Sequence, residues 1–155
     1  MRVLFVCLGN ICRSPAAEAV MKEKARKAGL DKEIVCDSAG TGAYHAGEKA
    51  DPRMIEHAKK RQVAITSIAR QVNPNDLIEF DFVVAMDTSN YDNLIKMASG
   101  QEQINKIFKM TKFSSNSDHD DVPDPYYGGQ DGFELVLDIL EDACSGLLTH
   151  LKSKL

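Results

Sequence analysis

Short apolar runs alternate along the chain with segments whose apolar residues recur at helical spacing. Runs rich in β-branched and aromatic residues predict buried strands at residues 2–6 and 80–86, and two weaker runs predict strands at 33–38 and 104–110. Helices are predicted between and after them, at 15–28, 51–61, 89–97 and along an apolar stripe from Phe133 to Leu151. This alternation indicates an α/β fold in which a parallel sheet has helices on both faces.

The predicted helices begin and end at residues with fitting local chemistry. Gly29 is expected to end the first helix, and Asp87 is expected to cap the helix after the third strand. Ser14 is expected at the N-cap of the first helix, with Pro15 at its first helical position. His57, on the second helix, is expected to be exposed.

The most informative stretch is Val-Cys-Leu-Gly-Asn-Ile-Cys-Arg-Ser-Pro at residues 6–15. Cys7 ends the first apolar run, and five residues separate it from Arg13. The stretch therefore predicts a strand, a tight loop and a helix start. Backbone N–H groups of such a loop can point inward and bind an anion, and the dipole of the following helix adds to the attraction. Cys7 is expected at the bottom of this nest and Arg13 at its rim.

A cysteine in such a nest has the surroundings of a nucleophile. Inward N–H groups, a helix N-terminus and a nearby cation favour the thiolate, and the Ser14 hydroxyl is placed to donate to it. A phosphate bound there would meet the Arg13 guanidinium, whose fork matches phosphate oxygens bidentately. Its phosphorus would face the Cys7 sulfur. Gly9 permits a turn that a Cβ would obstruct, and Asn10 tolerates the left-handed region and can brace the loop through its side chain.

Two other interpretations of the cysteines in this loop are open. Cys7 could be a buried strand cysteine, which is a common place for a free thiol. Cys7 and Cys12 could bind a metal, although no second pair of cysteine or histidine residues lies at zinc-site spacing. A cysteine and an arginine at this spacing are weak evidence alone. The added Ser-Pro, the preceding strand and the following helix favour the catalytic interpretation.

The stretch at 6–15 and Asp-Pro-Tyr-Tyr-Gly-Gly at 124–129 together resemble the low-molecular-weight protein tyrosine phosphatase family. The similarity covers nearly the whole chain and includes, in the expected order, Asp-Ser-Ala-Gly at 37–40, Asp-Pro-Arg at 51–53, Ala-Arg-Gln at 69–71 and Met-Asp at 86–87. The resemblance implies one domain over residues 1–155, a four-stranded, doubly wound parallel sheet and a phosphate-binding loop after the first strand. It also implies a protein tyrosine phosphatase that forms a phosphocysteine intermediate and needs no metal or other cofactor.

The resemblance assigns further site residues. Asp124, stiffened by prolines on either side, would protonate the leaving oxygen and later take a proton from the attacking water. An aryl ring would lie in an apolar slot lined by Leu8, Ile11, Tyr44, Tyr126 and Tyr127, which favours phosphotyrosine over the shorter phosphoserine. The phosphate-binding set is Leu8, Gly9, Asn10, Ile11, Cys12 and Ser14. Expected partners are phosphotyrosine-containing proteins, with inorganic phosphate or other oxyanions as inhibitors.

Four other functions are weighed against this one. A thioredoxin-coupled arsenate reductase needs a downstream cysteine pair, and residues 80–95 contain no cysteine. Phosphoarginine phosphatases of similar fold typically have threonine where Ile11 stands. A non-catalytic phosphotyrosine-binding module would usually have lost Cys7 or Asp124, and a flavodoxin-like FMN protein would leave Cys7 and Arg13 unexplained.

Composition narrows the setting of the protein. The 155 residues are 43% hydrophobic and 27% charged, which is typical of a globular domain. The net charge of −4 gives no support to nucleic-acid or acidic-membrane binding, and no apolar run approaches a membrane span. The four unevenly spaced cysteines predict free thiols in the cytoplasm, with Cys36 and Cys144 in the core. The chain is expected to be a monomer, with weak self-association left open.

Two questions about the loop follow from the resemblance. Relatives with a cysteine at the position of Cys12 are thought to use it as a redox partner, forming a disulfide with the oxidised nucleophile. Some relatives also carry a histidine that braces the loop residue Asn10, at the position where this chain has Ser67. The sequence therefore leaves open how the loop is held.

Overall fold

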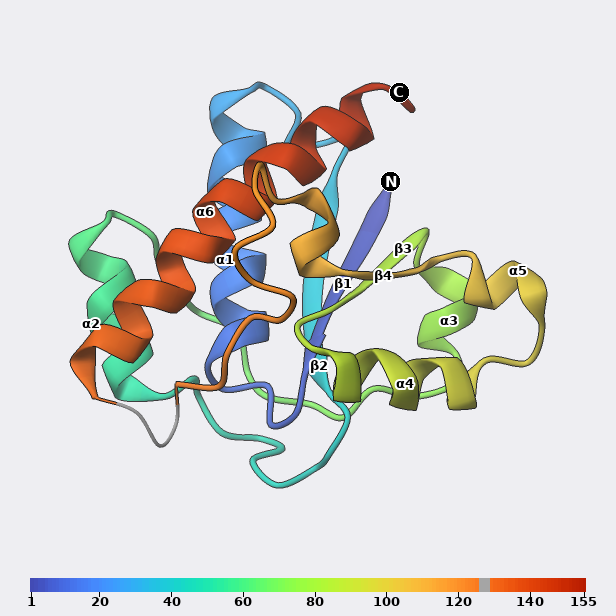
Figure 1. The fold of residues 1–155 in the computed structure, drawn as a ribbon, viewed down its shortest axis with the longest axis horizontal. Helices are drawn as coiled ribbons and strands as arrows, with labels where there is room; N and C mark the ends of the chain where they lie inside the picture. The colour runs from blue at the N-terminus through green and yellow to red at the C-terminus, as the bar shows by residue number, and fades with distance from the viewer. Residues whose placement is uncertain (126–128) are drawn as a thin grey trace.

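The strands form a parallel sheet in a computed structural model that describes residues 1–125 and 129–155. In this part of the chain the sheet has four strands in the order β2-β1-β3-β4 (Figure 1). Each neighbouring pair is parallel, and β1 lies in the middle, between β2 and β3. The strands are β1 (Arg2–Cys7), β2 (Val35–Gly40), β3 (Phe82–Ala85) and β4 (Ile107–Lys109).

Helices cover both faces of this sheet, as the alternation of the sequence predicts. On one side α1, α2 and α6 pack together, and α3 and α4 lie on the other side (Figure 1). The helices are α1 (Arg13–Lys27), α2 (Pro52–Lys60), α3 (Asp76–Glu79), α4 (Thr88–Met97), α5 (Gln101–Ile104) and α6 (Gln130–Lys152), with a 3-10 turn, η1 (Met110–Phe113). No helix in the described part of the chain is both long and apolar enough to cross a membrane. The doubly wound α/β prediction is confirmed.

Strand β1 is buried from both sides. Val3 and Phe5 belong to the apolar cluster that includes α1 and α6, whereas Leu4 and Val6 belong to the cluster on the α3 and α4 side. All four side chains are fully buried, and burial of each stabilises the fold by roughly 1.5–3 kcal/mol. The end of β1, where Cys7 stands, is therefore fixed between two cores.

Several helix ends follow their local sequence signals. Gly29 has φ +71°, a left-handed conformation that suits glycine, and it follows α1 directly after its C-cap. The Asp87 carboxylate accepts from the Asn90 amide and caps α4, as expected. Asp51 caps α2 in the same way, by accepting from the Arg53 amide.

Other local predictions are wrong. Helix α1 begins at Arg13, with Cys12 at its N-cap, so Ser14 and Pro15 lie inside the first turn. The Ser14 hydroxyl makes other hydrogen bonds, and proline is tolerated in a first turn because its missing N–H has no helical acceptor there. Strand β4 is shorter than the predicted run 104–110, because Ile104 ends α5, and α3, α5 and η1 were not predicted.

His57 is also placed differently from the prediction. Its side chain is only 12% exposed. The imidazole stacks on Phe133, with ring centroids 5.3 Å apart, and its Nδ1 lies 2.5 Å from the Glu134 carboxylate. The histidine therefore joins α2 to α6, a tertiary contact that the polarity of its own helix does not reveal.

Candidate active site

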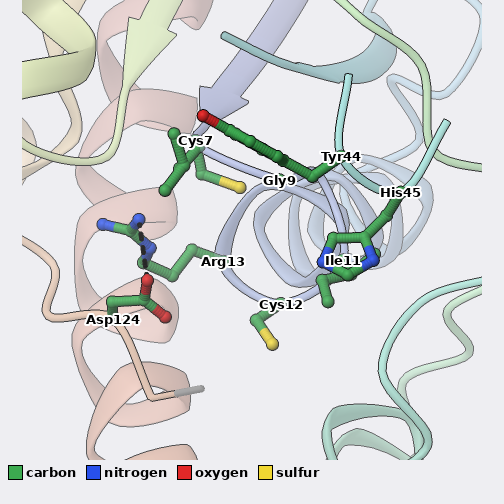
Figure 2. A pocket seen from close by; sticks show the side chains of 9 residues that line it. Cys7, Gly9, Ile11, Cys12, Arg13, Tyr44, His45 and Asp124 are labelled. Atoms are coloured by element: carbon green, nitrogen blue, oxygen red, sulfur yellow. Dashed lines mark ion pairs between the residues drawn. The ribbon is translucent and has the colours of Figure 1, made fainter. Parts of the chain in front are cut away.

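A pocket opens at the carboxyl end of β1, beside β3, which is where open α/β sheets bind ligands. Its volume is about 270 Å³. In Figure 2, Arg13 and Asp124 lie on one side of the pocket and Ile11 and His45 on the other. The described lining residues are Cys7, Leu8, Gly9, Ile11, Cys12, Arg13, Tyr44, His45 and Asp124. The structure thus brings the predicted Cys7, Arg13 and Asp124 together.

The loop between β1 and α1 turns its carbonyl groups away from the pocket. The carbonyls of Cys7, Leu8 and Ile11 accept hydrogen bonds from the amides of Thr41, Gly42 and Asp51. Among the described residues, by contrast, no acceptor is bonded to the backbone amides of residues 9–13. Successive amides of this kind at the start of a helix form an anion-binding concavity. The amides of this loop are therefore available to bind an anion, which is what the predicted nest requires.

Asn10 has φ +58°, a left-handed conformation, and its side chain sits at the centre of a buried chain of hydrogen bonds. The Arg70 amide donates to Asn10 Oδ1 over 3.0 Å, and because an amide N–H can only donate, this contact fixes the orientation of the Asn10 side chain. Asn10 Nδ2 then donates to Ser14 Oγ over 2.8 Å. The hydrogen of the Ser14 hydroxyl remains, and its nearest acceptor is Cys7 Sγ at 3.0 Å, closer than the Ala39 carbonyl at 3.4 Å.

This chain of hydrogen bonds answers the question raised by Ser67. A backbone amide, that of Arg70, braces Asn10 in this protein. The Arg70 carbonyl in turn accepts from the Gly40 amide at the end of β2, so the brace is anchored in the sheet. Asn10 and Ser14 are 1% and 0% exposed and lie outside the pocket lining, so they support the loop between β1 and α1 from beneath.

Two glycines allow the loop to pack closely. At Gly40 a Cβ would come within 2.7 Å of the Leu8 carbonyl oxygen, so the end of β2 must lack a side chain where it meets the loop between β1 and α1. At Gly9 a Cβ would come within 3.1 Å of His45 Cδ2. A side chain at position 9 would therefore need His45 to shift by a few tenths of an ångström, and the φ of Gly9 is not left-handed. Gly40 was not predicted as a site residue, because its role depends on a contact across the sheet.

The Arg13 guanidinium is buried, with its side chain 4% exposed. Nη1 donates to Asp87 Oδ2 over 2.6 Å and to the Val122 carbonyl over 3.1 Å. Nη2 lies 3.7 Å from Asp124 Oδ2. Burial opposes the charge, but Cys7 and the two carboxylates outweigh it and raise the pKa of Arg13 above its usual value. The guanidinium is therefore a permanently charged group whose plane is fixed by neighbours behind it.

Asp87 and the Val122 carbonyl are site residues whose direct contact with Arg13 the sequence did not reveal. Asp87 was expected to cap the helix after the third strand, and it does cap α4. Its position directly after β3, at the edge where open α/β sheets place functional groups, is a sequence signal for a place near the site. The backbone carbonyl of Val122 carries no such signal.

Asp124 reaches the pocket from a loop between η1 and α6. Its side chain is 39% exposed, and Figure 2 marks its ion pair with Arg13. Just before it, the Val122 amide donates to the Met86 carbonyl over 2.8 Å, and the Val122 side chain is fully buried. The loop is therefore attached to the end of β3 two residues before the carboxylate.

The walls of the pocket are partly apolar. Leu8 and Tyr44 are 44% and 74% exposed, so their side chains stand at the mouth, while Ile11 is buried. Tyr126 and Tyr127, also predicted to line the slot, lie outside the described residues. His45, on the same loop as Tyr44, also lines the pocket, although it was not among the predicted site residues. Its Nδ1 lies 2.9 Å from the Glu48 carboxylate, three residues further along the same loop.

Cys12 is buried and unpaired, like the other three cysteines. Burial, followed by the negative charge of Asp51, raises the pKa of the Cys12 thiol far above its usual value. Burial also raises the pKa of Cys36 to about 12 and that of Cys144 beyond its usual range. Cys36 and Cys144 lie in the core as predicted. These three thiols are therefore protonated near neutral pH, so none of them is readily attacked by peroxide.

The fold and this loop match one family along the chain. Residues 2–155 match the low molecular weight phosphotyrosine protein phosphatase family, and the chain belongs to it. A crystal structure of a protein tyrosine phosphatase from Entamoeba histolytica is 49% identical, with a TM-score of 0.96 over 99% of this chain and 98% of that one.

Two further relatives bear on the activity. YfkJ of Bacillus subtilis, named a low molecular weight protein-tyrosine-phosphatase, is 40% identical over 98% of this chain and 96% of its own length. The crystal structure of YfkJ gives a TM-score of 0.93. A Drosophila arginine phosphatase is 31% identical, with a TM-score of 0.92 over 98% of both chains. Proteins similar to this chain are thus named for two kinds of phosphate substrate.

Proposed function

We propose that this protein is a cysteine-dependent phosphatase that hydrolyses phosphotyrosine in proteins, and small aryl phosphates, through a phosphocysteine intermediate. The observation that carries the proposal is the convergence of Cys7, Arg13 and Asp124 on one pocket whose floor is a loop of unbonded amides. The family membership and the tyrosine phosphatases among its relatives support the same activity.

In the first step the Cys7 thiolate attacks phosphorus while the bond from phosphorus to the tyrosine oxygen breaks. Asp124 gives its proton to that oxygen, so the leaving group departs as a neutral phenol. The loop amides and the Arg13 guanidinium bind the three remaining phosphate oxygens. The Ser14 hydroxyl, 3.0 Å from the sulfur, stabilises the thiolate before attack and as the leaving group in the second step.

In the second step a water attacks phosphorus on the side that the phenol has left. The Asp124 carboxylate takes a proton from this water, the bond from sulfur to phosphorus breaks, and phosphate leaves the Cys7 thiolate behind. The same carboxylate thus acts first as acid and then as base. Inorganic phosphate, being the product, and similar oxyanions are expected to inhibit by occupying the same loop.

The walls of the pocket favour an aryl ester. Leu8, Ile11 and Tyr44 offer an apolar slot above the phosphate loop, and a phosphoserine side chain would leave this slot unfilled. Phosphoarginine is the second candidate, because an arginine phosphatase has a closely similar fold. Ile11 at the pocket wall argues against it, since phosphoarginine phosphatases of this fold typically have threonine there.

The test is a comparison of kcat/KM on peptides that differ only in carrying phosphotyrosine, phosphoserine or phosphoarginine. We expect turnover of the phosphotyrosine peptide to exceed that of the other two by orders of magnitude. Cys7→Ser is the control, because a serine hydroxyl is a poor nucleophile at neutral pH. This variant should still bind vanadate but turn over none of the peptides. Turnover by Cys7→Ser, or a preference for phosphoarginine, would overturn the proposal.

We also infer that the enzyme works in the reducing cytoplasm and that Cys12 protects it from oxidation. Peroxide would convert the Cys7 thiolate to a sulfenic acid, and attack by Cys12 on that sulfur would release water and leave a disulfide. A thiol reductant would restore both thiols. Wild type should therefore recover after peroxide treatment and Cys12→Ser should recover poorly. Equal recovery of the two proteins, or no Cys7–Cys12 link in a peptide map, would exclude this role.

A further inference from the structure

The loop that carries Asp124 is fastened at three consecutive residues just before it. The Asp120 carbonyl accepts from Thr111 Oγ1 over 2.7 Å. The Asp121 carboxylate binds Thr88 at the start of α4 and Lys109 at the end of β4. Both backbone groups of Val122 are bonded, its amide to Met86 and its carbonyl to Arg13. The path of the chain is thus fixed up to two residues before the proposed acid.

The Asp121 carboxylate joins the start of α4 to the end of β4. Its Oδ1 accepts from the Thr88 amide and from Thr88 Oγ1, each over 3.0 Å. The same oxygen lies 2.7 Å from Lys109 Nζ, which also donates to Thr88 Oγ1 over 2.9 Å. Burial opposes the charge of Asp121, but Lys109 and Thr88 outweigh it and lower the pKa of this carboxyl. Asp121 is therefore a carboxylate at neutral pH, with three donors on one oxygen.

These contacts close a ring with the phosphate-binding arginine. Thr88 follows Asp87 in the chain, and Val122 follows Asp121. Arg13 Nη1 binds both the Asp87 carboxylate and the Val122 carbonyl. The contact between Thr88 and Asp121 completes the ring on its outer side. These contacts thereby fix the position of the loop that carries Asp124 relative to the Arg13 guanidinium.

The cluster formed by Asp121, Thr88 and Lys109 contributes little to the stability of the fold. The side chains of Asp121 and Lys109 are 41% and 27% exposed. Ion pairs that are partly exposed typically stabilise a fold only slightly, because solvent screens the two charges. Its geometry, with several donors converging from two elements, instead restricts where the following residues can lie.

We propose that Asp121, held by Thr88 and Lys109, is a positioning residue that keeps Asp124 within reach of the leaving-group oxygen. The inference rests on the proposed function, in which Asp124 is the acid. Asp121 touches neither the substrate nor the reacting atoms and acts through the two residues that separate it from Asp124. Displacement of a catalytic group by about 1 Å can cost roughly 10²-fold in rate. A less firmly held loop around Asp124 should therefore slow proton transfer measurably.

The experiment measures kcat/KM for a series of aryl phosphates whose phenols range from acidic to weakly acidic. In Asp121→Ala and Lys109→Met we expect a loss of roughly 10- to 100-fold for the least acidic phenols. For the most acidic phenols, which leave without a proton, kcat/KM should stay near the wild-type value. Lys109→Arg, which keeps the cation, should restore most of the loss. A positioning defect thus changes the dependence on the leaving group, which a merely structural defect does not.

Two controls separate the possible failures. Asp118→Ala removes a carboxylate from the same loop. The backbone amide of Asp118 donates to Asn116 Oδ1, and this hydrogen bond remains possible in the variant. The variant should leave the whole series unchanged. Asp124→Asn serves as the reference for a lost acid. If Asp124→Asn shows no dependence on the leaving group, the proposed acid itself is wrong.

The outcome for Asp121 is then decided against that reference. If Asp124→Asn shows the dependence and neither Asp121→Ala nor Lys109→Met does, the positioning role is excluded while the phosphatase mechanism stands. A uniform loss across the series, accompanied by a lower melting temperature, would also exclude it, because it would show that the cluster only supports the fold. Lys109→Met keeps the test decisive if Asp121→Ala does not fold.

Discussion

The phosphate loop and the loop that carries Asp124 meet in one pocket, but they are held in different ways. Behind the phosphate loop, Asn10 and Ser14 are almost fully buried and bonded to one another and to the sheet. The loop that carries Asp124, the acid loop, has one buried attachment, at Val122, and is otherwise held from outside by the part-exposed Asp121 and Lys109. The Asp124 side chain itself is 39% exposed. Buried groups thus hold the first loop, whereas the second depends partly on groups at the surface.

The difference fits what each loop has to do. Transition-state oxygens must meet donors that are already in place, because reorganising them during the reaction would cost rate. Breaking a buried hydrogen bond leaves a group unsatisfied and costs about 1–3 kcal/mol, so the buried brace resists displacement. In the proposed mechanism, Asp124 must reach the leaving group of a protein substrate, which requires an accessible side chain. Its weaker attachments are sufficient to aim it.

Arg13→Lys is expected to have the largest effect among the changes that sharpen this comparison. Lysine keeps the charge but loses the fork, which here binds Asp87 and Val122 behind while facing the pocket. We expect kcat/KM for p-nitrophenyl phosphate to fall by roughly 10³- to 10⁵-fold, the value of an arginine that stabilises a phosphoryl-transfer transition state.

The matched control for Arg13→Lys is Arg61→Lys. Arg61 is partly buried, with its side chain 20% exposed, and is also bound to carboxylates, those of Glu134, Asp138 and Glu141. It lies between α2 and α6, away from the pocket. This variant should retain near wild-type kcat/KM. If Arg13→Lys kept wild-type activity, charge alone would be sufficient and the fixed plane of the guanidinium would have no catalytic value.

Asp124→Asn should distinguish the contribution of the acid loop to turnover from that of the phosphate loop to anion binding. We expect kcat/KM for a phosphotyrosine peptide to fall by roughly 10²- to 10⁴-fold, the usual value of general acid catalysis. Inhibition by inorganic phosphate should be equal or tighter, because the variant removes a negative charge 3.7 Å from the Arg13 guanidinium without touching the phosphate loop. Weaker phosphate inhibition would show that the acid loop helps to hold the anion, which contradicts the division of roles described above.

The sequence predicted the scaffold well and the supports of the site only in part. Strand β1 is a continuous apolar run, and its buried environment on both faces demands that pattern. The motif around Cys7 and Arg13 was equally plain. The N-terminal boundary of α1 was mispredicted because Ser14, a residue typical of caps, uses its hydroxyl to form hydrogen bonds with Asn10 and Cys7.

The supports that could not be predicted are made by backbone groups and by distant side chains. The Arg70 amide braces Asn10, and the Val122 carbonyl holds Arg13. Any residue other than proline carries the same amide, and every residue the same carbonyl, so no residue type marks these positions. The burial of His57 depends on Phe133, on a helix far along the chain. Such contacts follow from the fold and become visible only when the elements are placed.

The smallest effect is expected from the residue that braces the phosphate loop, Asn10. Its left-handed φ and its two hydrogen bonds can be separated by a pair of variants. Asn10→Gly keeps the backbone conformation and removes both hydrogen bonds, whereas Asn10→Ala adds the strain of a Cβ at positive φ. We expect kcat/KM to fall roughly 10- to 100-fold in Asn10→Gly, the equivalent of one or two lost hydrogen bonds, and further in Asn10→Ala.

The assay for these variants should use an aryl phosphate with an acidic phenol, so that Asp124 does not limit the rate, together with inhibition by phosphate. Because the brace supports the loop that binds the anion, both Asn10 variants should bind phosphate more weakly, in contrast to Asp124→Asn. Their loss should be uniform across leaving groups, since the acid loop is unchanged. If Asn10→Gly bound phosphate as tightly as wild type, the loop would hold its shape through its carbonyl contacts to Thr41, Gly42 and Asp51 alone. The buried brace would then have no part in preparing the site, and the contrast between the two loops would be wrong.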